Sequence, residues 1–503
     1  MAVAAAMSHV VVVVLGDLGR SPRMQYHACS LCELEEVATV SVVGYSGEKL
    51  LPSLQQHSKC REYRIDDCGA KKFAFLRRIS GLLFTMYKGW LLLLQLWRLL
   101  GSIGHYDAIL IQNPPCIPVA LVALARTILG VPRHSKVIID WHNLGYTMFS
   151  EQSKLLRGVS YVLEACIAQL ADAHICVSGR MQHWLQSRFA CEVTVQHDRP
   201  FGLFSKEPLS LSLKHSLFQK LAFTDAALFP RLHFDAHAPT EATIHTIAAK
   251  GGGQVSSREG HNVSIILSST SWTEDEDFSI LIDALVLLET SLQQRYERCS
   301  RAGLAGEGSE RVLCIITGKG PLKAAFERAV ATRQLDGSLG AFVAVRTLWL
   351  EVEDYVHLVG CADLGVCLHT STSGLDLPMK VLDMFGSGVP VLAVAFPCLE
   401  ELIQHNRNGM IFASSSELCD QLQELLYGGA GRRDALRRLR AGAAATQAWS
   451  DCWGGSTELV MLAALRDKGA ARASLLAATL LRTALIVVAA LFVVGFGLRS
   501  IDL

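Results

Sequence analysis

The sequence predicts an α/β protein made of two doubly wound, Rossmann-like lobes, and three observations predict it. Short β-branched runs alternate with helix-length stretches over residues 1–200, the alternation stops over 201–261, and it restarts over 262–460. Strands separated by helix-length segments are typical of parallel sheets with helical crossovers. Ligands of such sheets bind beyond the carboxyl ends of the strands, so two facing lobes are expected to form a cleft there.

Each predicted element rests on a short apolar run or on a longer helical stretch. In the first lobe, strands are predicted at 10–15, 37–45, 108–112, 137–140, 174–177 and 192–196, and helices at 24–36, 73–101, 117–129 and 155–171. In the second lobe, strands are predicted at 263–267, 312–317, 342–346, 364–368 and 389–394, and helices at 274–288, 321–333, 378–386 and 416–426. Residues 233–261 are rich in His, Ala, Thr and Gly without a period, so 201–261 is interpreted as a linker or insertion.

The composition excludes several classes of protein. The 503 residues include 47 Lys and Arg against 47 Asp and Glu, so no bulk positive charge indicates nucleic-acid binding. An apolar fraction of 50% excludes intrinsic disorder. The mean hydropathy of +0.29 is high for a soluble enzyme and indicates that part of the chain meets lipid. The 15 cysteines are too sparse for a disulfide scaffold and favour a reducing compartment.

Two apolar stretches are predicted to meet the membrane. Residues 474–498 are interpreted as a transmembrane tail, in which Arg482 reaches the interface and the preceding basic residues keep the large N-terminal part in the cytosol. Residues 79–100 combine a Leu-rich body with basic and aromatic side chains, which suits a helix in the headgroup plane. The alternatives are an amphipathic helix for the tail and a core helix for 79–100. The N-terminal apolar run 10–15 is too short for a signal sequence and is interpreted as a buried strand.

The first predicted strand ends in a glycine turn that opens a helix. Gly16 and Gly19 let the backbone approach a bound group, and a helix N-terminus favours an anion. Arg20 and Arg23 add donors suited to phosphate. The turn is therefore predicted to bind phosphate, with an ordinary glycine turn as the alternative. Neither lobe has the G-x-G-x-x-G spacing that a nicotinamide enzyme needs.

A hydroxyl-rich turn follows the first strand of the second lobe. Ser269, Thr270 and Ser271 offer hydroxyl and amide donors where a phosphate can lie. Thr273 and Glu276 have the spacing of a capping box, which predicts a helix start.

The next strand of the second lobe leads into a tighter turn. Lys319 stands between Gly318 and Gly320, ahead of a proline suited to the first helical position. A lysine held in this way can meet a diphosphate as a point charge, so the turn is predicted to bind phosphate rather than to be a plain connection.

Residues 374–391 are the most specific run in the chain. Asp376 precedes a predicted helix, and Asp383 lies two turns further on. Both carboxylates are expected to face the cleft and to accept hydrogen bonds from ribose or hexose hydroxyls, although Asp376 alone fits a helix cap equally well. Lys380, in the first turn, is expected to meet a phosphate.

These residues resemble a family. Residues 374–391 are similar to the Glu-x(7)-Glu helix of two-lobed GT-B glycosyltransferases, with Asp383 in the place of the second acid and Leu375 in that of the first. The chain as a whole resembles the chitobiosyldiphosphodolichol β-mannosyltransferases. The matching stretches are 13–28, 112–115, 139–146, 268–277, 317–321, 374–388 and Asn408-Gly409. They cover roughly residues 10–200 and 262–415.

The resemblance implies an enzyme of the endoplasmic reticulum membrane whose catalytic lobes face the cytosol. Such an enzyme transfers the first mannose from GDP-mannose to dolichyl-diphosphate chitobiose, with inversion and a β-1,4 link. A complex with other transferases of that pathway is a further partner that the resemblance allows. Two departures stand out: the usual N-terminal anchor is missing, and His197 occupies the place of an aromatic residue before Asp198-Arg199-Pro200.

The resemblance also implies roles for single residues. An inverting transfer needs a general base, for which His142 and Asp17 are favoured over Asp140, since histidine titrates nearest neutrality. Arg199 is a further donor to the diphosphate. Such folds work without a divalent metal or other cofactor, so none is expected. The alternatives are another membrane-bound GT-B transferase with a different nucleotide sugar, and a non-catalytic transferase subunit.

Overall fold

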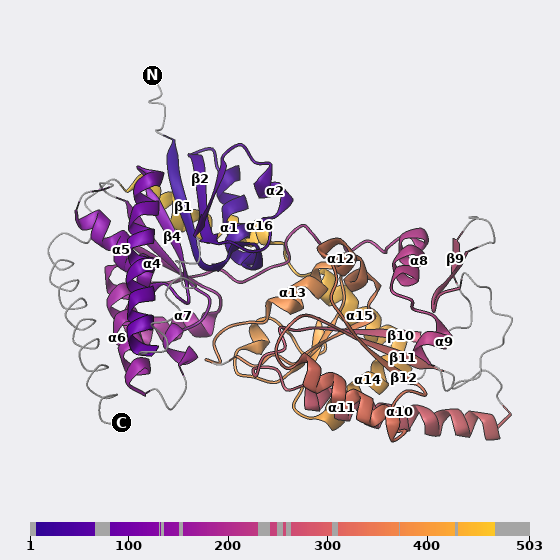
Figure 1. Ribbon diagram of the computed structural model, residues 1–503. Helices are drawn as coiled ribbons and strands as arrows, with labels where there is room; N and C mark the ends of the chain where they lie inside the picture. Colours follow the sequence, from indigo (N-terminus) through magenta and orange to yellow (C-terminus); the bar gives the residue numbers. More distant parts are fainter. Residues whose placement is uncertain are drawn as a thin grey trace. The chain divides into compact units, whose positions relative to one another are not determined.

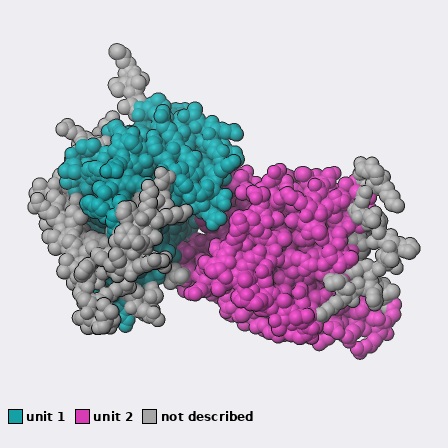
Figure 2. Space-filling view, in the orientation of Figure 1, with its two compact units in different colours: residues 1–198, 449–503 teal, residues 199–448 magenta. Residues whose placement is uncertain are grey.

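The computed structural model describes residues 7–65, 81–129, 131, 135–149, 154–229, 242–248, 255–257, 263–303, 310–371, 373–427 and 431–467. Two compact units share the chain (Figure 2). Unit 1 joins Met1–Asp198 to Trp449–Leu503, and unit 2 is Arg199–Ala448.

Unit 1 is built on a parallel seven-stranded sheet with the order β3-β2-β1-β4-β5-β6-β7. Figure 1 labels its strands β1, β2 and β4. Its strands are β1 (Ser8–Asp17), β2 (Val37–Tyr45), β3 (Cys60–Ile65), β4 (Ala108–Asn113), β5 (Lys136–Trp141), β6 (Ala173–Cys176) and β7 (Thr194–Val195). Its longer helices are α1 (Pro22–Glu33), α4 (Gly81–Ile103), α5 (Ile117–Ile128), α6 (Lys154–Leu170), α7 (Gly179–Phe189) and α17 (Thr457–Arg466), with the short α2 (Pro52–Gln55) and α16 (Trp449–Gly454). The run of valines in the middle of β1 is at most 1% exposed, as expected for a parallel strand covered on both faces.

Unit 2 is built on a parallel six-stranded sheet with the order β12-β11-β10-β13-β14-β15. Its strands are β10 (Val263–Ser269), β11 (Arg311–Thr317), β12 (Val343–Leu348), β13 (Leu364–Cys367), β14 (Val391–Val394) and β15 (Gly409–Phe412), with a separate antiparallel pair, β8 (Thr246–Ala248) and β9 (Val255–Ser257). Its helices are α8 (Leu211–Lys220), α9 (Asp225–Leu228), α10 (Phe278–Arg301), α11 (Lys323–Leu335), α12 (Val352–Cys361), α13 (Met379–Gly386), α14 (Ser415–Tyr427) and α15 (Arg432–Ala444).

Both sheets have the same doubly wound topology. In each, the first strand lies inside the sheet, the second and third follow on one side, and the fourth, fifth and sixth follow on the other. The strand order therefore reverses between β1 and β4 in unit 1, and between β10 and β13 in unit 2. Ligands of doubly wound sheets bind beyond the carboxyl ends of the strands at this reversal. The predicted pair of α/β lobes is confirmed.

The segment interpreted as a linker or insertion, 201–261, contributes to the core of unit 2 where it is described. Phe218, Phe223 and Phe229 are at most 1% exposed and belong to the same apolar cluster as Ile265 of β10. Asp225 accepts a hydrogen bond from the Arg311 side chain at 2.7 Å, and both residues are buried. The segment therefore covers one face of the second sheet, and its buried phenylalanines explain why.

The C-terminal boundary of the second lobe also differs from the prediction, which extended that lobe to residue 460. From Trp449 onward the chain returns to unit 1, where α16 lies beside α1 (Figure 1). The reason is burial of large aromatic rings. Trp449 is 1% exposed and packs edge-on against Tyr26, while Trp453 is 3% exposed.

The predicted membrane segments have different outcomes. Residues 474–498 lie outside the described residues. Among the described helices, none combines the length and the apolar character that crossing a bilayer requires. Residues 81–100 of the stretch 79–100 belong to α4, which buries Leu96 and Leu100 while exposing Trp90 by 60% and Trp97 by 37%. Helix α4 is therefore a surface helix of unit 1 with one face packed on the domain.

The packing of α8 leads to a first prediction. Phe218→Ala should lower the free energy of unfolding of unit 2 by about 3–5 kcal/mol, because it removes a fully buried ring. The control is Leu213→Ala on the same helix, where the side chain is 48% exposed and the change should be small. Urea denaturation of the full chain measures both. Equal, small effects would show that the segment is a linker after all.

Candidate functional site

The candidate site residues lie at the carboxyl ends of the strands next to each reversal of strand order. In unit 1 they follow β1 and β5, and in unit 2 they follow β10, β11 and β13. We describe the two groups separately.

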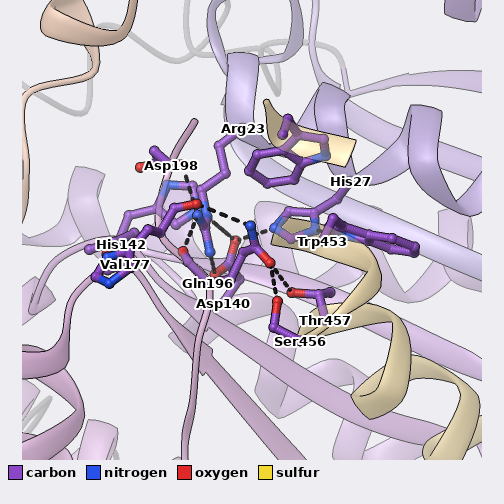
Figure 3. Close-up of polar contacts among 12 residues, drawn as sticks. Arg23, His27, Asp140, His142, Val177, Gln196, Asp198, Trp453, Ser456 and Thr457 are labelled. Atoms are coloured by element: carbon purple, nitrogen blue, oxygen red, sulfur yellow. Dashed lines mark hydrogen bonds and ion pairs between the residues drawn. The ribbon is translucent and has the colours of Figure 1, made fainter. Parts of the chain in front are cut away.

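Arg23 lies in the interior of unit 1 (Figure 3). Its side chain is 1% exposed and donates to both carboxylate oxygens of Asp140, each at 2.8 Å. A further nitrogen donates to Asp198 at 2.7 Å and to the Gln196 carbonyl at 2.8 Å. Arg23 was predicted to be a donor to a phosphate bound at the glycine turn. The structure corrects this prediction, because the guanidinium instead ties α1 to β5 and to Asp198, the last residue of the first segment of unit 1.

Asp140 is the centre of this buried group. Two imidazoles approach its Oδ2 atom: His142 Nε2 at 2.8 Å and His27 Nε2 at 3.2 Å (Figure 3). Burial alone would raise the pKa of Asp140, but Arg23 and the two histidines hold it well below its usual range. Asp140 is thus a carboxylate that stays ionised at neutral pH, which orients its neighbours and is unsuited to act as the base itself.

Asp140 fixes the tautomer of His142. An ionised carboxylate only accepts hydrogen bonds, so Nε2 of His142 carries the proton that points at Asp140. In the neutral ring, the lone pair is therefore on Nδ1. The side chain of His142 is 21% exposed while Asp140 is fully buried. Of the two residues, only His142 is accessible from solvent.

Trp453, in the segment from Trp449 onward that returns to unit 1, fixes the tautomer of His27 in the same way. Trp453 Nε1, which can only donate, gives a 2.9 Å hydrogen bond to His27 Nδ1 (Figure 3). The ring proton of His27 is therefore on Nε2, facing Asp140. Burial lowers the pKa of His27, which favours the neutral ring. Nearby, the Gln196 side chain accepts hydrogen bonds from Ser456 and from Thr457, the latter at 3.2 Å.

A buried glutamate holds the loop that follows His142. The Asn113 carbonyl accepts from the His142 backbone N–H at 2.8 Å. Glu164, 1% exposed, accepts from the N–H groups of Gly145 at 2.8 Å and Tyr146 at 3.4 Å. Burial raises the pKa of Glu164 to about 7 despite these bonds. Sequence reasoning missed Glu164, because nothing in its helix marks it as different from a surface acid.

Asp17, the other predicted base, is engaged by backbone amides. Its carboxylate accepts from Gly19 N at 3.0 Å and from Glu48 N at 3.0 and 3.1 Å. It thereby closes the turn that contains the predicted phosphate-binding residues Gly16 and Gly19. Arg20 is 57% exposed, and its ion pairs are long, at 3.6 Å to Asp17 and 3.5 Å to Glu48. Of the two predicted arginines, Arg20 is the one available to an anion, and of the two predicted bases His142 is the better placed.

In unit 2, two glycines bring the turns after β10 and β11 into backbone contact. A Cβ atom on Gly318 would lie 1.9 Å from the Thr270 carbonyl, and one on Gly320 would lie 1.9 Å from the Ser271 carbonyl. No other residue type fits these positions without moving the turns apart. Lys319, exposed between them, places its ammonium 3.9 Å from the ring centre of Trp349. The turn thus presents one cation at the surface.

The predicted capping box is wrong. Helix α10 begins at Phe278, and its cap is Asp277, which accepts from the Ser279 N–H. Glu276 instead has a buried carboxylate that accepts from the Thr270 hydroxyl and from Ser271 N, and pairs with Lys380 Nζ at 2.6 Å. The predicted phosphate ligand Lys380, 25% exposed, is therefore held in place by an acid of the turn after β10.

Asp383 lies in a short chain of hydroxyl groups. The Tyr355 hydroxyl of α12 donates a hydrogen bond to Asp383 and forms another with the Ser269 hydroxyl, each at 2.9 Å. The Thr317 hydroxyl donates to Ser269 at 3.1 Å. Burial raises the pKa of Asp383 to about 7, with Tyr355 and Lys380 opposing the shift. Tyr355 was not anticipated, because its helix was not predicted.

Asp376 is not a helix cap, since the residue at the cap position of α13 is Pro378, without a side-chain bond. Its carboxylate accepts from Ser371 and, at 3.4 Å, from Ser373. Its other oxygen lies 3.5 Å from His369 Nε2. Arg199, the remaining predicted donor ligand, is half-buried at the first position of unit 2. Within the described ranges, no group of three or more His, Cys, Asp or Glu side chains could hold a metal ion.

Comparisons with known proteins agree with this architecture. Residues 302–427 match the family model described as Glycosyl transferases group 1. The crystal structure of Anabaena Alr3699/HepE in complex with UDP and glucose has a TM-score of 0.58 and 13% identity, over 91% of this chain and 99% of that one. A glycosyltransferase from Rickettsia africae has a TM-score of 0.57 and 10% identity, over 92% and 100%. At these identities the likeness shows the fold alone, the GT-B fold with two Rossmann-like sheets.

Relatives by sequence are much more similar. The chitobiosyldiphosphodolichol beta-mannosyltransferase of Mus musculus is 36% identical over 88% of this chain and 87% of its own length. The enzyme with the same name from Dictyostelium discoideum is 34% identical over 83% and 84%. A protein of Arabidopsis thaliana named UDP-glycosyltransferase TURAN is 36% identical over 88% and 95%.

The two arginines of the first turn lead to a second prediction. Arg23→Ala should lower the free energy of unfolding by about 3–5 kcal/mol, because it leaves buried carboxylates without their cation. Arg20→Ala is the control and should change it by less than about 1 kcal/mol, since its ion pairs are exposed. Thermal and urea unfolding of the full chain compare the two variants. Equal stability would contradict the buried role of Arg23.

Proposed function

The chain belongs to the chitobiosyldiphosphodolichol β-mannosyltransferase family and is a mannosyltransferase of lipid-linked oligosaccharide synthesis; from this premise we propose that GDP-mannose is its donor and dolichyl-diphosphate chitobiose its acceptor. The proposal adds an inverting β-1,4 transfer. The relatives' shared name supports the acceptor, and the paired side chains of His142 and Asp140 support the chemistry.

His142 acts as the general base in this proposal. The attacking hydroxyl of the terminal GlcNAc approaches the anomeric carbon of mannose from the face opposite GDP. Its proton passes to Nδ1 of His142, the new C–O bond forms, and the bond to the diphosphate breaks, with GDP leaving. The imidazolium formed on His142 is stabilised by Asp140, 2.8 Å from Nε2. This pairing of an accessible imidazole with an ionised, buried carboxylate is the observation that carries the mechanism.

The diphosphate of the donor is assigned to unit 2. Charge that develops on departing GDP is stabilised best by groups that are already in place. Lys319 above Trp349 and Lys380 against Glu276 are two such cations, both on turns at the carboxyl ends of strands or at the start of a helix. Ser269, Thr270 and Ser271 line the first of these turns, and Arg20 in unit 1 remains an exposed cation for the acceptor diphosphate.

Membrane attachment is part of the proposal. The acceptor carries a dolichol chain, so the enzyme must work at a bilayer surface, and we place it at the endoplasmic reticulum with both lobes in the cytosol. The exposed Trp90 and Trp97 of α4 suit the headgroup region, where tryptophan is enriched. Residues 474–498 remain the proposed anchor. Partnership with other transferases of the pathway is also proposed.

One observation favours a second candidate donor. The Arabidopsis relative, as similar in sequence as the mouse enzyme, is named a UDP-glycosyltransferase. A transferase of the same fold that uses a UDP-sugar is therefore the alternative, and it differs from the first candidate only in the nucleotide and the sugar.

The third prediction concerns the base. Membranes that contain His142→Ala should transfer mannose about 10²–10⁴ times more slowly than the wild type, the usual contribution of a general base. His183→Ala, an exposed histidine on α7, is the matched control and should retain wild-type transfer. The rate is measured with dolichyl- or phytanyl-diphosphate chitobiose and GDP-mannose. Near-normal transfer by a folded His142→Ala would assign the base elsewhere.

The fourth prediction concerns the donor. The wild-type chain should form a product with one β-linked mannose from GDP-mannose, and none from UDP-glucose or UDP-N-acetylglucosamine at equal concentration. Radiolabelled donor and glycosidase digestion of the lipid product identify the link. Faster transfer from a UDP-sugar would replace the first candidate with the second, and no transfer from any donor would favour a non-catalytic subunit.

A further inference from the structure

A carboxylate–imidazole–carboxylate arrangement lies at the strand-order reversal of unit 2. His369 follows β13, Asp275 lies in the turn after β10, and Asp376 precedes α13. Nδ1 of His369 is 2.8 Å from Asp275 Oδ2, and Nε2 is 3.5 Å from Asp376 Oδ2. Sequence reasoning singled out Asp376 but not His369 or Asp275.

The geometry favours an imidazolium form of His369. Ionised carboxylates only accept, so each ring nitrogen must carry a proton to interact with its partner. Burial alone would lower the pKa of His369, but the interactions with Asp275 and Asp376 outweigh it and raise the pKa to about 9. The hydrogen bond from His369 in turn lowers the pKa of Asp275. His369 thus stays an imidazolium, and Asp275 a carboxylate, through the neutral range.

His369 forms ion pairs with the carboxylates of Asp275 and Asp376. The other groups described around it are either engaged elsewhere or uncharged. The adjacent acid, Glu276, is engaged by Lys380 at 2.6 Å. Cys367 has its pKa raised to about 11 by burial, so it is a neutral thiol. The ring of Phe396 meets His369 edge-on, with 6.3 Å between ring centres.

Asp275 is itself held by hydrogen bonds from the end of β13. The backbone N–H and the hydroxyl of Thr370 both donate to the Asp275 carbonyl at 2.9 Å. Glu276 and His369 form a β-bridge beside it. The turn after β10 and the end of β13 are therefore tied together by hydrogen bonds, with the imidazole between them.

Asp376 is oriented from two sides. The Ser371 and Ser373 hydroxyls donate to Oδ1, and His369 faces Oδ2. With its side chain 19% exposed, Asp376 keeps surface for a ligand. Carboxylate oxygens that are already oriented accept hydroxyl donors without paying rotamer entropy at binding.

We propose that His369 is a positioning residue of the donor site: anchored by Asp275, it orients the Asp376 carboxylate to accept hydrogen bonds from the hydroxyl groups of a nucleotide sugar. The inference rests on the proposed function. It adds that His369 and Asp275 together orient Asp376 for the donor. His369 acts through Asp376 and does not touch the reacting atoms.

Two substitutions of His369 separate its two contacts. The amide nitrogen of Asn reaches the Nδ1 position and keeps the bond to Asp275, whereas that of Gln reaches the Nε2 position and keeps the contact with Asp376. With purified full-length chain at pH 7, His369→Asn should weaken GDP-mannose binding at least about tenfold, by calorimetry. His369→Gln should stay within about threefold of the wild type. Equal losses in both variants, or none in His369→Asn, would overturn the proposal.

The pH dependence provides a second measurement, which needs no variant that folds poorly. Because the pKa of His369 is raised in the folded chain, its contribution is complete at neutral pH and lost as the pH rises through about 9. Wild-type affinity should therefore fall across that range more steeply than the affinity of His369→Gln, whose curve also accounts for titration of guanine. Parallel curves would contradict the role. A wild-type chain that neither binds GDP-mannose nor transfers mannose would instead refute the proposed function.

Discussion

The buried pair of Arg23 and Asp140 is the interaction on which unit 1 depends. The guanidinium meets the carboxylate through two parallel hydrogen bonds, at 1% and 0% exposure. Such a pair is stabilising only when its other polar atoms are also satisfied. Asp198 and the Gln196 carbonyl satisfy the arginine, and His142 and His27 approach the remaining face of Asp140. The structural ion pair and the proposed catalytic base therefore share one carboxylate.

Both units pair acidic side chains with basic ones near the candidate site, although the residues differ. In unit 1 a buried acid is surrounded by an arginine and two imidazoles. In unit 2 two adjacent acids of one turn, Asp275 and Glu276, each hold a cation, His369 and Lys380. Groups fixed in this way do not need to reorganise when charge moves during a reaction, which is the main means by which an active site stabilises a transition state.

The sequence predicted what depends on local pattern. The strands from 263–267 to 389–394 all appear within a few residues of their predicted positions, because buried parallel strands are continuous apolar runs. Among the elements that were missed are the short β3 and β15 and the helices α7 and α12. Their apolar residues are few or lie among polar ones, so no period stands out.

The candidate site was predicted at the level of turns but not of pairs. The turns after β1, β5, β10, β11 and β13 were all identified, because glycine, hydroxyl and charged residues interrupt the apolar pattern there. The side-chain pairs could not be recognised from the sequence. Arg23 meets Asp140 across 117 positions, and Trp453 meets His27 across 426, so neither contact leaves a spacing to recognise. The capping box failed for a related reason: Glu276 is engaged by Lys380, 104 positions away, and not by its own helix.

The return of the chain to unit 1 has a consequence for biosynthesis. The ribosome releases α1 and β5 early, but the tryptophan that contacts His27 belongs to α16, which emerges only after all of unit 2 has been made. At the usual rate of translation the interval is on the order of tens of seconds. During that time unit 2 can fold as a continuous segment, while the nascent first lobe lacks the two indole rings that cover its interior. Unit 1 is thus the first lobe to be synthesised and the last to be completed.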